Sequence, residues 1–454
     1  MSSSAPVKRI AVIGAGPAGF YAADALVKTF GDGASVDLIE RLPTPYGLVR
    51  FGVAPDHQKI KSVTRLYDRT LADPRVRYLG NVEFGKHLTL EDLKRHYHAV
   101  VFAVGSPNDR RLGVAGEDLK GSMSATEFVA WYNCHPDYRH LEVPLDAKTA
   151  VIVGVGNVAI DVARVLAKTV TELGETDMAD HALEHLATST IEDIIIVGRR
   201  GPAETKFTTK ELRELGELAN ADIFVREDEL EVSPESLGAI QGDVNATKNL
   251  EVLQGFGQQQ PTGKPRRLHI RFLLSPTEFR GNGRVTSVVC AKNRLEARPD
   301  GSLAAVPTGA TEELEADLVF RSIGYQGTPL PGVPFDERRA VIPNAAGRVL
   351  DAPDGQPVKG LYVAGWIKRG PSGVIGTNKA CAMETVATLA GDELLSPEDP
   401  RPEAVDALLA SRGARPFTAA HWAKLDAFET AAGVAQGRPR VKLIDVDEMF
   451  AAIS

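Results

Sequence analysis

Two stretches of the chain repeat one order of elements: an apolar run, a glycine-rich turn and a helical pattern. In the first stretch, Ile10–Ile13 precedes the turn Gly14–Gly19. In the second, Ala150–Val153 precedes Gly154–Ala159, and a helix is predicted from about Val158 to Val170. Short apolar runs bounded by glycine predict buried strands, so each stretch opens a βαβ unit of a parallel sheet.

Further strands and loops extend this pattern along the chain. Strand signals also lie at Val36–Glu40, Ala99–Val104, Ile194–Val197, Arg267–Phe272, Val285–Val289, Ala316–Phe320 and Gly360–Gly365. The Pro- and Gly-rich segment Pro43–Asp56 predicts a structured loop, and Thr208–Leu218 predicts a charged helix. The expected fold class is α/β, with two Rossmann-like dinucleotide-binding domains.

Composition excludes several classes of protein. The 454 residues carry a net charge of −8, which argues against a nucleic-acid binder. No apolar run is long enough to span a membrane, and only nine residues precede the strand at Ile10. The three cysteines (Cys134, Cys290 and Cys381) form no Cys-x-x-Cys pair, so no disulfide framework, Cys-ligated metal site or redox pair is expected. These features suit a cytoplasmic protein.

The first turn has the pattern of a dinucleotide site. Gly14, Gly16 and Gly19 form Gly-x-Gly-x-x-Gly between a strand and a helix. Such glycines let backbone N–H groups approach a pyrophosphate at the helix N-terminus. Glu40 follows Gly19 by 21 positions, where an acidic residue accepts ribose hydroxyls and repels a 2′-phosphate. The turn therefore predicts FAD or NAD rather than NADP; the alternative is a glycine turn used only for packing.

The second turn has the opposite charge at the ribose position. Gly154-x-Gly156-x-x-Ala159 is followed by Arg199-Arg200 after 40 positions, about twice the usual spacing. The polar stretch Thr171–Thr190 has the length of an insertion that accounts for the excess. Two guanidinium groups there favour a 2′-phosphate and hence NADPH over NADH. The alternative is a surface arginine pair at a strand end. A flavin in one site and a nicotinamide in the other predict a flavin reductase.

Two longer segments resemble a known family. Pro43–His57 (PTPYGLVRFGVAPDH) and Gly365–Asn378 (GWIKRGPSGVIGTN) are similar to the adrenodoxin reductase family, and within it to bacterial NADPH–ferredoxin reductases. The resemblance extends from Ile10 to Arg438–Lys442. It implies a glutathione-reductase-like fold in which residues 109–324 form an NADP domain inserted in an FAD domain of residues 1–108 and 325–454. It also implies hydride transfer from NADPH to FAD, and then single-electron transfer to an iron–sulfur protein.

The resemblance assigns binding roles to individual residues. Those implied for FAD are Ala18, Glu40, Leu48, Val82, Trp366, Gly373, Val374 and Ile375, beside the glycines of the first turn. Those implied for NADP(H) are Arg110, Val155, Gly156, Asn157, Val158, Arg199, Arg200 and Glu211, and Gly373 would lie beside both cofactors. A helix starting over Gly373–Thr377 would stabilise a reduced flavin. Without the surrounding motif, Trp366 would be assigned to the core. Related disulfide reductases have Gly-Asp where this chain has Gly365-Trp366, and they use a cysteine pair; both departures argue against thiol chemistry.

His57 and Glu214 resemble a family pair at the contact between nicotinamide and flavin, and they are the candidate catalytic residues. Hydride transfer requires no proton from a side chain, so the pair is expected to orient the nicotinamide or to adjust the local charge. The alternatives are a structural loop histidine and a glutamate on a solvated helix face.

The expected partner is a ferredoxin-type iron–sulfur protein, and the chain is expected to be a monomer or a homodimer. Because ferredoxins are usually acidic, docking requires a local basic patch on this acidic chain. The candidates are Lys59, Lys61, Arg65, Lys368, Arg369, Arg266, Arg267 and Arg271. Two other functions remain open. One is a flavin subunit of a larger complex, as in glutamate synthase small subunits, which usually carry N-terminal cysteine clusters that residues 1–9 lack. The other is a nucleotide-sensing binding module.

Overall fold

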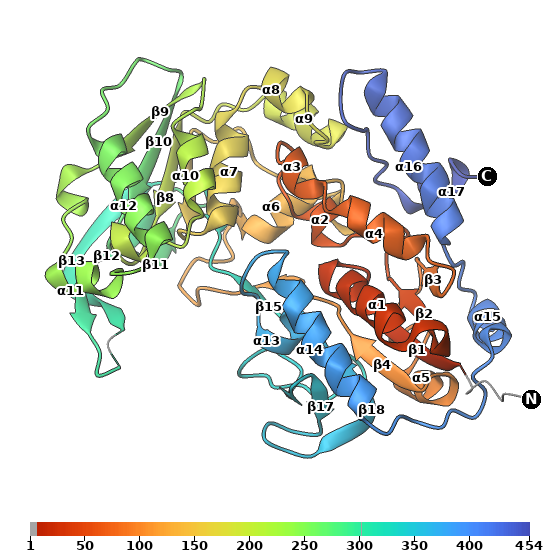
Figure 1. Ribbon diagram of the computed structural model, residues 1–454. Helices are drawn as coiled ribbons and strands as arrows, with labels where there is room; N and C mark the ends of the chain where they lie inside the picture. Colours follow the sequence, from red (N-terminus) through yellow and green to blue (C-terminus); the bar gives the residue numbers. More distant parts are fainter. Residues whose placement is uncertain (1–6, 301) are drawn as a thin grey trace, which may run out of the picture.

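The structure, a computed structural model, describes residues 7–300 and 302–454 and has two lobes, each built on a parallel sheet (Figure 1). The first sheet has seven strands in the order β16-β17-β18-β4-β1-β2-β3. Their bounds are β1 (Lys8–Ile13), β2 (Ala34–Ile39), β3 (Val76–Leu79), β4 (Ala99–Phe102), β16 (Asn344–Ala345), β17 (Arg348–Leu350) and β18 (Pro357–Val363). Five strands are parallel, and β16 and β17 extend the sheet antiparallel. The sheet thus contains strands from the N-terminal part of the chain (β1–β4) and from its C-terminal part (β16–β18).

The strands of this sheet are apolar throughout because both of its faces are covered. In β4, Ala99 and Val101 belong to one hydrophobic core, while Val100 and Phe102 belong to another. The first core is closed by α1 (Pro17–Phe30), which packs beside α14 (Thr377–Gly391). Pro17 in the first turn of α1 has no N–H to leave unsatisfied, which suits this position.

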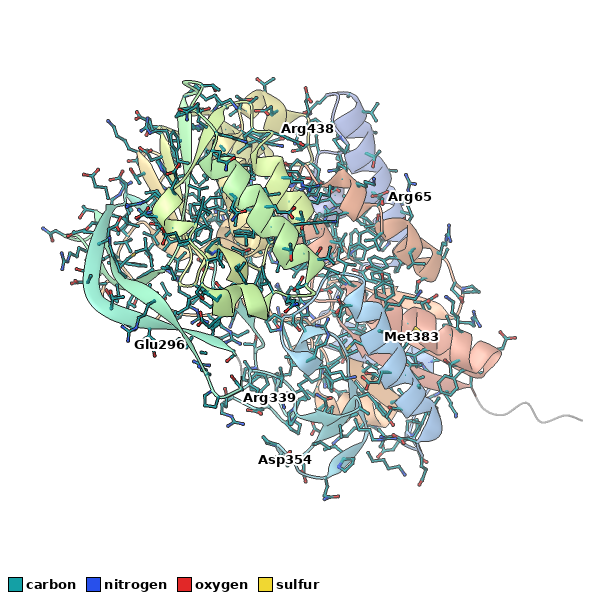
Figure 2. The ribbon with its side chains drawn as sticks, turned by 60° about the vertical axis from the view of Figure 1, so that its left-hand side comes forward. Arg65, Glu296, Arg339, Asp354, Met383 and Arg438 are labelled. Atoms are coloured by element: carbon teal, nitrogen blue, oxygen red, sulfur yellow. The ribbon has the colours of Figure 1, made fainter. Side chains whose placement is uncertain are left out.

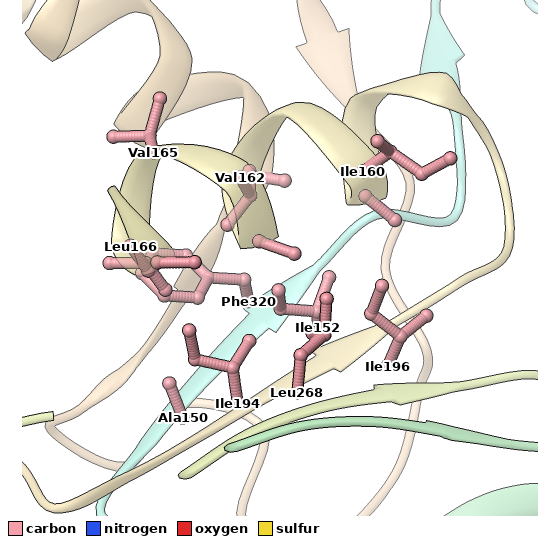
Figure 3. Packing of buried hydrophobic residues seen from close by; sticks show 14 of the residues in the cluster. Ala150, Ile152, Ile160, Val162, Val165, Leu166, Ile194, Ile196, Leu268 and Phe320 are labelled. Atoms are coloured by element: carbon pink, nitrogen blue, oxygen red, sulfur yellow. The ribbon is translucent and has the colours of Figure 1, made fainter. Parts of the chain in front are cut away.

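The second sheet has six parallel strands in the order β6-β14-β7-β8-β10-β9. Their bounds are β6 (Ser122–Ser124), β7 (Thr149–Val153), β8 (Asp193–Val197), β9 (Ala221–Val225), β10 (Arg266–Arg271) and β14 (Leu318–Arg321). Helix α7 (Asn157–Ala167) covers one face, where Ile160 and Val162 meet Ile152 and Ile196 (Figure 3). The antiparallel strands β11 (Leu274–Arg280), β12 (Ser287–Ala297) and β13 (Leu303–Glu315) cover the other face.

The remaining helices surround these sheets. They are α2 (Leu48–Phe51), α3 (Gln58–Lys61), α4 (Thr64–Leu71), α5 (Leu90–His96), α6 (Ala125–Tyr132), α8 (Val170–Gly174), α9 (Asp180–Ala187), α10 (Thr209–Leu215), α11 (Pro234–Ala239), α12 (Val244–Gly257), α13 (Trp366–Arg369), α15 (Pro402–Ser411), α16 (Ala419–Val434) and α17 (Val446–Ala451). Short 3-10 turns lie at Gly31–Gly33, Pro136–Tyr138, Pro202–Glu204 and Glu227–Glu229. Among the helices of the described ranges, none combines the length and apolar character that crossing a membrane requires.

The chain crosses between the two sheets twice, and both crossings lie together. Strand β5 (Asn108–Asp109) pairs antiparallel with β15 (Tyr325–Gln326), and the Arg110 amide donates to the Gly324 carbonyl at 3.0 Å. One short two-stranded ribbon therefore carries both connections.

The structure corrects three of the predicted elements. The helix predicted to reach Val170 ends at Ala167, because Lys168 and Thr169 are extended and Thr169 caps α8. The helix expected over Gly373–Thr377 begins only at Thr377. The loop Pro43–Asp56 contains a helical turn, α2. In the inserted stretch Thr171–Thr190, Leu173 of α8, Leu186 of α9 and Met178 between these helices are buried, so apolar side chains anchor the stretch despite its polar composition.

Candidate functional site

The first glycine turn is shaped by close approaches of backbone to backbone. A Cβ atom on Gly19 would overlap the carbonyl oxygen of Gly14, so only glycine fits where α1 meets the end of β1. No side chain caps the N-terminus of α1 among the described residues, and Gly16 stands at the N-cap. The first N–H groups of the helix are therefore directed to the turn, as a pyrophosphate site requires.

Glu40 lies directly beside this turn at the end of β2. Its carboxylate accepts the backbone N–H of Ala15 at 2.8 Å and that of Leu42 at 3.2 Å. Burial raises the pKa of Glu40 above its ordinary value, although the two backbone donors oppose this shift. Each carboxylate oxygen can accept a second hydrogen bond. The carboxylate can therefore hold the turn in place and also accept hydrogen bonds from ribose hydroxyls. Val82, whose N–H donates to the Glu40 carbonyl at 2.9 Å, adds a buried wall.

The other residues expected to hold FAD have side chains that the protein alone leaves incompletely covered. Leu48 is 37% exposed and Val374 is 61% exposed, both large apolar side chains, while Ile375 is half-buried. The buried Nε1–H of Trp366 has no acceptor among the described residues, and its ring lies 5.3 Å from that of Tyr325. These features fit a large flat ligand that covers apolar side chains and supplies an acceptor.

Contacts between backbones bring several of these residues together. A Cβ on Gly365, just before Trp366, would lie 2.5 Å from the Cβ of Ala18 on α1. One on Gly47, just before Leu48, would lie 3.0 Å from the Cα of Gly16. Gly373 lies in the loop before α14, with φ +78°. The first turn, the α2 loop and the start of α13 thus lie close together.

The second glycine turn is built in the same way. Gly154 has φ +133°, and a Cβ there would overlap the carbonyl oxygen of Ser322. Helix α7 begins at Asn157, whose Oδ1 accepts the N–H of Thr208 at 2.8 Å, and Val158 lies in its first turn. The carbonyl of Val155 accepts the N–H of Lys206 at 3.0 Å. These bonds place Gly156 and the start of α7 beside the start of α10.

Glu211 lies in the first turn of α10 and is buried, and it accepts the Thr208 hydroxyl at 2.8 Å. Burial raises the pKa of Glu211. The same contact that joins α10 to α7 therefore brings Glu211 to the second turn.

Arg199 and Arg200 lie at the end of β8, where the second turn needs a ribose-reading group. Their backbones are held by the antiparallel strands, because the Arg199 carbonyl accepts Asn293 Nδ2 at 2.9 Å and the Arg200 carbonyl accepts the N–H of Leu273 at 3.1 Å. Arg199 is exposed, Arg200 is half-buried, and neither has a carboxylate partner within the described ranges. Both guanidinium groups thus remain available to a phosphate. Arg110, also exposed, donates to the Tyr325 carbonyl at the crossing between the sheets.

His57 and Glu214 come from different lobes and meet at their boundary. The two side chains form a hydrogen bond of 2.9 Å between Nε2 of His57 and Oε2 of Glu214. His57 is buried at the N-cap of α3, and Glu214 is half-buried on α10. Burial tends to raise the pKa of Glu214, but the His57 bond and the Arg164 charge outweigh it and lower this pKa. Glu214 is therefore an anion that accepts the histidine N–H.

The sequence did not single out the charged groups on α7 that surround this pair. Asp161 Oδ1 lies 3.9 Å from His57 Nδ1 and 3.1 Å from Nη1 of Arg164. Arg164 also donates to Asp56 at 2.9 and 2.6 Å, and Lys168 donates to Asp56 at 2.7 Å. Asp161 and Arg164 are three residues apart on the helix that starts at the second glycine turn. That spacing is the one sequence signal that could have revealed them.

Comparisons with known proteins agree with this geometry. Residues 8–197 match the family described as pyridine nucleotide-disulphide oxidoreductase. The chain is 46% identical to the NADPH-ferredoxin reductase FprA of Mycobacterium tuberculosis, over 97% of this chain and 98% of that protein. It is 40% identical to the mitochondrial NADPH:adrenodoxin oxidoreductase of Arabidopsis thaliana, over 99% and 96%. The solved structure of M. tuberculosis FprA in complex with NADPH superposes with a TM-score of 0.92 at 44% identity, covering 98% of this chain and 99% of that one. The chain belongs to the adrenodoxin reductase family.

This member of the adrenodoxin reductase family lacks the thiols that a disulphide reductase needs. Cys134, Cys290 and Cys381 are all free and buried. Burial raises the pKa of Cys134 and of Cys290 to about 12, so neither provides a thiolate near neutral pH. The expectation that thiol chemistry does not operate here is thus supported by the environment of the side chains as well as by their spacing.

Replacement of His57 by glutamine is expected to slow reduction of the flavin by NADPH roughly 10-fold, because the pair that bridges the two lobes loses its geometry. Rapid mixing of NADPH with oxidised protein under anaerobic conditions measures this half-reaction. A rate equal to that of the unaltered protein would remove His57 from the mechanism.

Asp161 gives a prediction about pH. Burial raises its pKa to about 7, with Glu211 and Asp56 adding to the shift and Arg164 opposing it. Between pH 4 and 7 the folded state holds a proton that the unfolded state has released, so the free energy of unfolding falls as pH rises. Asp161→Asn removes this slope. Relative to the unaltered protein, the variant should gain about 2–4 kcal/mol between pH 4 and 8. Urea unfolding across this range tests it; parallel curves for the two proteins would contradict it.

Proposed function

We propose that this protein is an FAD-dependent NADPH:ferredoxin oxidoreductase. One observation carries the proposal: two dinucleotide turns with opposite charges at their ribose positions, Glu40 and Arg199-Arg200, face a boundary that His57 and Glu214 bridge. FAD held there would supply the chemistry that couples a two-electron hydride donor, NADPH, to a one-electron acceptor, an iron–sulfur protein. The names of the M. tuberculosis and A. thaliana relatives support this assignment.

The proposal divides the site residues between two ligands. FAD would be held by Gly14, Gly16, Ala18, Gly19, Glu40, Leu48, Val82, Trp366, Gly373, Val374 and Ile375. NADP(H) would be held by Arg110, Val155, Gly156, Asn157, Val158, Arg199, Arg200, Glu211 and Gly373. The N-termini of α1 and α7 supply N–H groups to the two pyrophosphates, while Arg199 and Arg200 select the 2′-phosphate.

His57 and Glu214 act as orienting groups in this scheme. The anionic Glu214 fixes the histidine ring by accepting its Nε2–H, and the side chains of Asp161 and Arg164 lie beside the pair. Because these groups are largely buried, they keep water from the boundary and present a fixed polar surface to the nicotinamide. No proton donor or acceptor is required of them.

The domain division belongs to the same proposal. We assign residues 1–108 and 325–454 to an FAD domain and residues 109–324 to an inserted NADP domain. The composition of the two sheets supports it, since β1–β4 and β16–β18 form one and β6–β10 with β14 form the other. A monomer or homodimer in the cytoplasm completes the proposal, and the free cysteines suit such a reducing compartment.

Anaerobic titration with NADPH and with NADH tests the proposed function. The purified protein should be yellow, should bleach with one equivalent of NADPH, and should regain its colour when oxidised ferredoxin is added. A colourless protein that binds NADPH without redox change would favour the nucleotide-sensing module. Reduction by NADPH without transfer to any soluble ferredoxin would favour a subunit of a larger complex.

The structure narrows the candidates for the partner surface. Lys61 and Lys368 are buried in ion pairs with Asp177 and Glu384, and Arg267 is paired with Asp193. The other two inserted-domain candidates are also engaged, Arg266 with backbone carbonyls and Arg271 with Glu229 and Glu312. Arg369 donates to Asn378, which leaves Lys59 and Arg65 exposed.

A group of cations that the sequence did not single out lies beside Glu214. A hollow of about 340 Å³ on α10 and α12 is lined by three cations, Lys210, Arg213 and Lys248, and by two carboxylates, Glu214 and Glu217. Three cations in one concave surface offer acidic groups of a ferredoxin more contacts than Lys59 and Arg65, which lie separately on α3 and α4, so we favour the hollow as the docking place.

Charge reversal at the hollow is expected to weaken ferredoxin binding. Arg213→Glu combined with Lys248→Glu should raise KM for ferredoxin roughly 10-fold at low salt and flatten its dependence on ionic strength. Activity from NADPH to ferricyanide should stay unchanged. Lys59→Glu with Arg65→Glu is the matched comparison. Equal effects of salt on ferredoxin and ferricyanide reduction in the unaltered protein would argue against local steering.

A further inference from the structure

The segment Arg438–Lys442 connects α16 to α17 and carries cations at three alternate positions. Arg438 reaches the inserted stretch, donating to the Thr176 carbonyl at 3.0 Å, to Asp180 at 2.5 Å and to the Met178 carbonyl. Arg440 pairs with Asp426 on α16 at 2.6 Å. Figure 2 labels Arg438 at the edge of the molecule, where α16 approaches the other lobe. The segment thus spans from the C-terminal helices to α8 and α9.

Lys442 is the most deeply buried of these cations, with its side chain inaccessible to solvent. Its Nζ lies 3.2 Å from Asp177 Oδ2 and donates to the carbonyls of Arg50 at 3.2 Å and Asn133 at 3.3 Å. Asp177 belongs to the inserted stretch, Asn133 follows α6, and Arg50 lies on α2. One ammonium group therefore joins elements of both lobes.

Asp177 holds a second lysine at the same time. Both of its oxygens accept from Lys61 Nζ, at 2.7 and 2.9 Å, and all three side chains are buried. Lys61 is the last residue of α3, and His57 is the N-cap of that same turn. At the other end of the turn, Asp56 is bound by Arg164 of α7 and by Lys168, which directly follows that helix. The short segment from Asp56 to Lys61 is thus held at both ends by the opposite lobe.

Asp177 is shared by two lysines, Lys61 and Lys442. Burial lowers the pKa of Lys61 to about 7; Lys442 and Arg440 add to this shift and Asp177 opposes it. Burial tends to raise the pKa of Asp177, but Lys442 and Lys61 outweigh it and lower this pKa to about 2. The Arg50–Glu429 ion pair and the Cys134 thiol complete the surroundings of Lys442. Because Asp177 has two lysine partners, loss of either one leaves no unpaired carboxylate.

We propose that Lys61, Asp177 and Lys442 are positioning residues that hold the His57 turn against the NADP-binding lobe and so set the alignment of the two cofactors. The inference rests on the proposed function for its consequence, but the restraint of the turn is a property of the chain itself. It also gives the Arg438–Lys442 motif, distant from both nucleotide sites in sequence, a role in the reaction.

Lys61→Met tests the proposal, because Met preserves the bulk of the side chain and Lys442 still pairs with Asp177. The rate of flavin reduction by NADPH should fall roughly 10-fold, as expected for a loosened alignment. The dissociation constant of 2′,5′-ADP, which occupies only the arginine end of the NADP site, should not change. Hydrogen exchange of the amides at residues 60–62, which bond to the carbonyls of His57, Gln58 and other residues of this turn, should accelerate.

Three further variants complete the test. Lys61→Arg should restore both the rate and the slow exchange, and Lys442→Met should act in the same direction as Lys61→Met. Lys359→Met, which removes an exposed lysine paired with Glu393 far from the boundary, is the matched control and should match the unaltered protein.

Unchanged exchange and unchanged reduction in both Lys61→Met and Lys442→Met would overturn the proposal. If the unaltered protein is not reduced by NADPH, the proposed function fails, and the exchange measurement still decides the restraint.

Discussion

With both Arg199 and Arg200 replaced by alanine, kcat/KM for NADPH is expected to fall about 10²–10⁴-fold, while the value for NADH changes only a few-fold. Each guanidinium group would supply a charge-assisted hydrogen bond to the 2′-phosphate, worth about 1.5–3 kcal/mol. Neither arginine has a carboxylate partner within the described ranges, so their removal leaves no buried charge behind. The fold should therefore survive, and the loss should be confined to the phosphate.

The measurement compares steady-state kcat/KM for the two nucleotides with ferricyanide as acceptor. Arg338→Ala with Arg339→Ala is the matched control, because these residues form an adjacent, exposed arginine pair outside both nucleotide turns (Figure 2 labels Arg339). A preference for NADPH that survives in the Arg199/Arg200 variant would refute the assignment of the second turn. A loss of the same size with both nucleotides would point instead to a structural role of the pair.

Gly19→Ala is expected to weaken retention of FAD strongly. The added Cβ would overlap the carbonyl oxygen of Gly14, and neither backbone can move, because β1 and α1 lie at the centre of the lobe. Overpacking of this kind costs about 1–3 kcal/mol or more, which corresponds to a roughly 10- to 100-fold weaker hold on the flavin. The purified variant should be nearly colourless and should melt at a lower temperature than the unaltered protein.

Flavin absorbance per mole of protein and thermal unfolding with and without added FAD measure this effect. Gly33→Ala is the matched control within the same βαβ unit, because a Cβ there would meet no atom within 4 Å. Full flavin content in Gly19→Ala would show that the turn tolerates a side chain. That result would contradict the assignment of the first turn to the flavin.

The elements around the two turns are the part of this protein that local sequence predicts best. At each turn, the apolar strand, the glycines and the helix follow one another directly in the sequence. The conformation of each residue there is therefore set by neighbours within a few positions. The fold class and the family follow from the same segments and are confirmed by the comparisons. Element ends were predicted less well: α7 ends at Ala167 because Thr169 and Glu172 form a capping box that starts α8, a Thr-x-x-Glu signal that the helical pattern concealed. The individual binding roles remain predictions.

By itself, the sequence determined that two Rossmann-like units occur in one chain, one followed by a carboxylate and the other by two arginines, because glycine spacing and the residue at a strand end are local properties. The tertiary structure alone decided how they meet. His57 and Glu214 are 157 residues apart, and Lys61 lies 116 residues from Asp177, which Lys442 also binds from near the end of the chain. Ion pairs over such separations leave no periodic trace in the sequence. Their partners are set by how the two sheets are stacked and by where the inserted helices rest, and these are outcomes of packing over the whole chain.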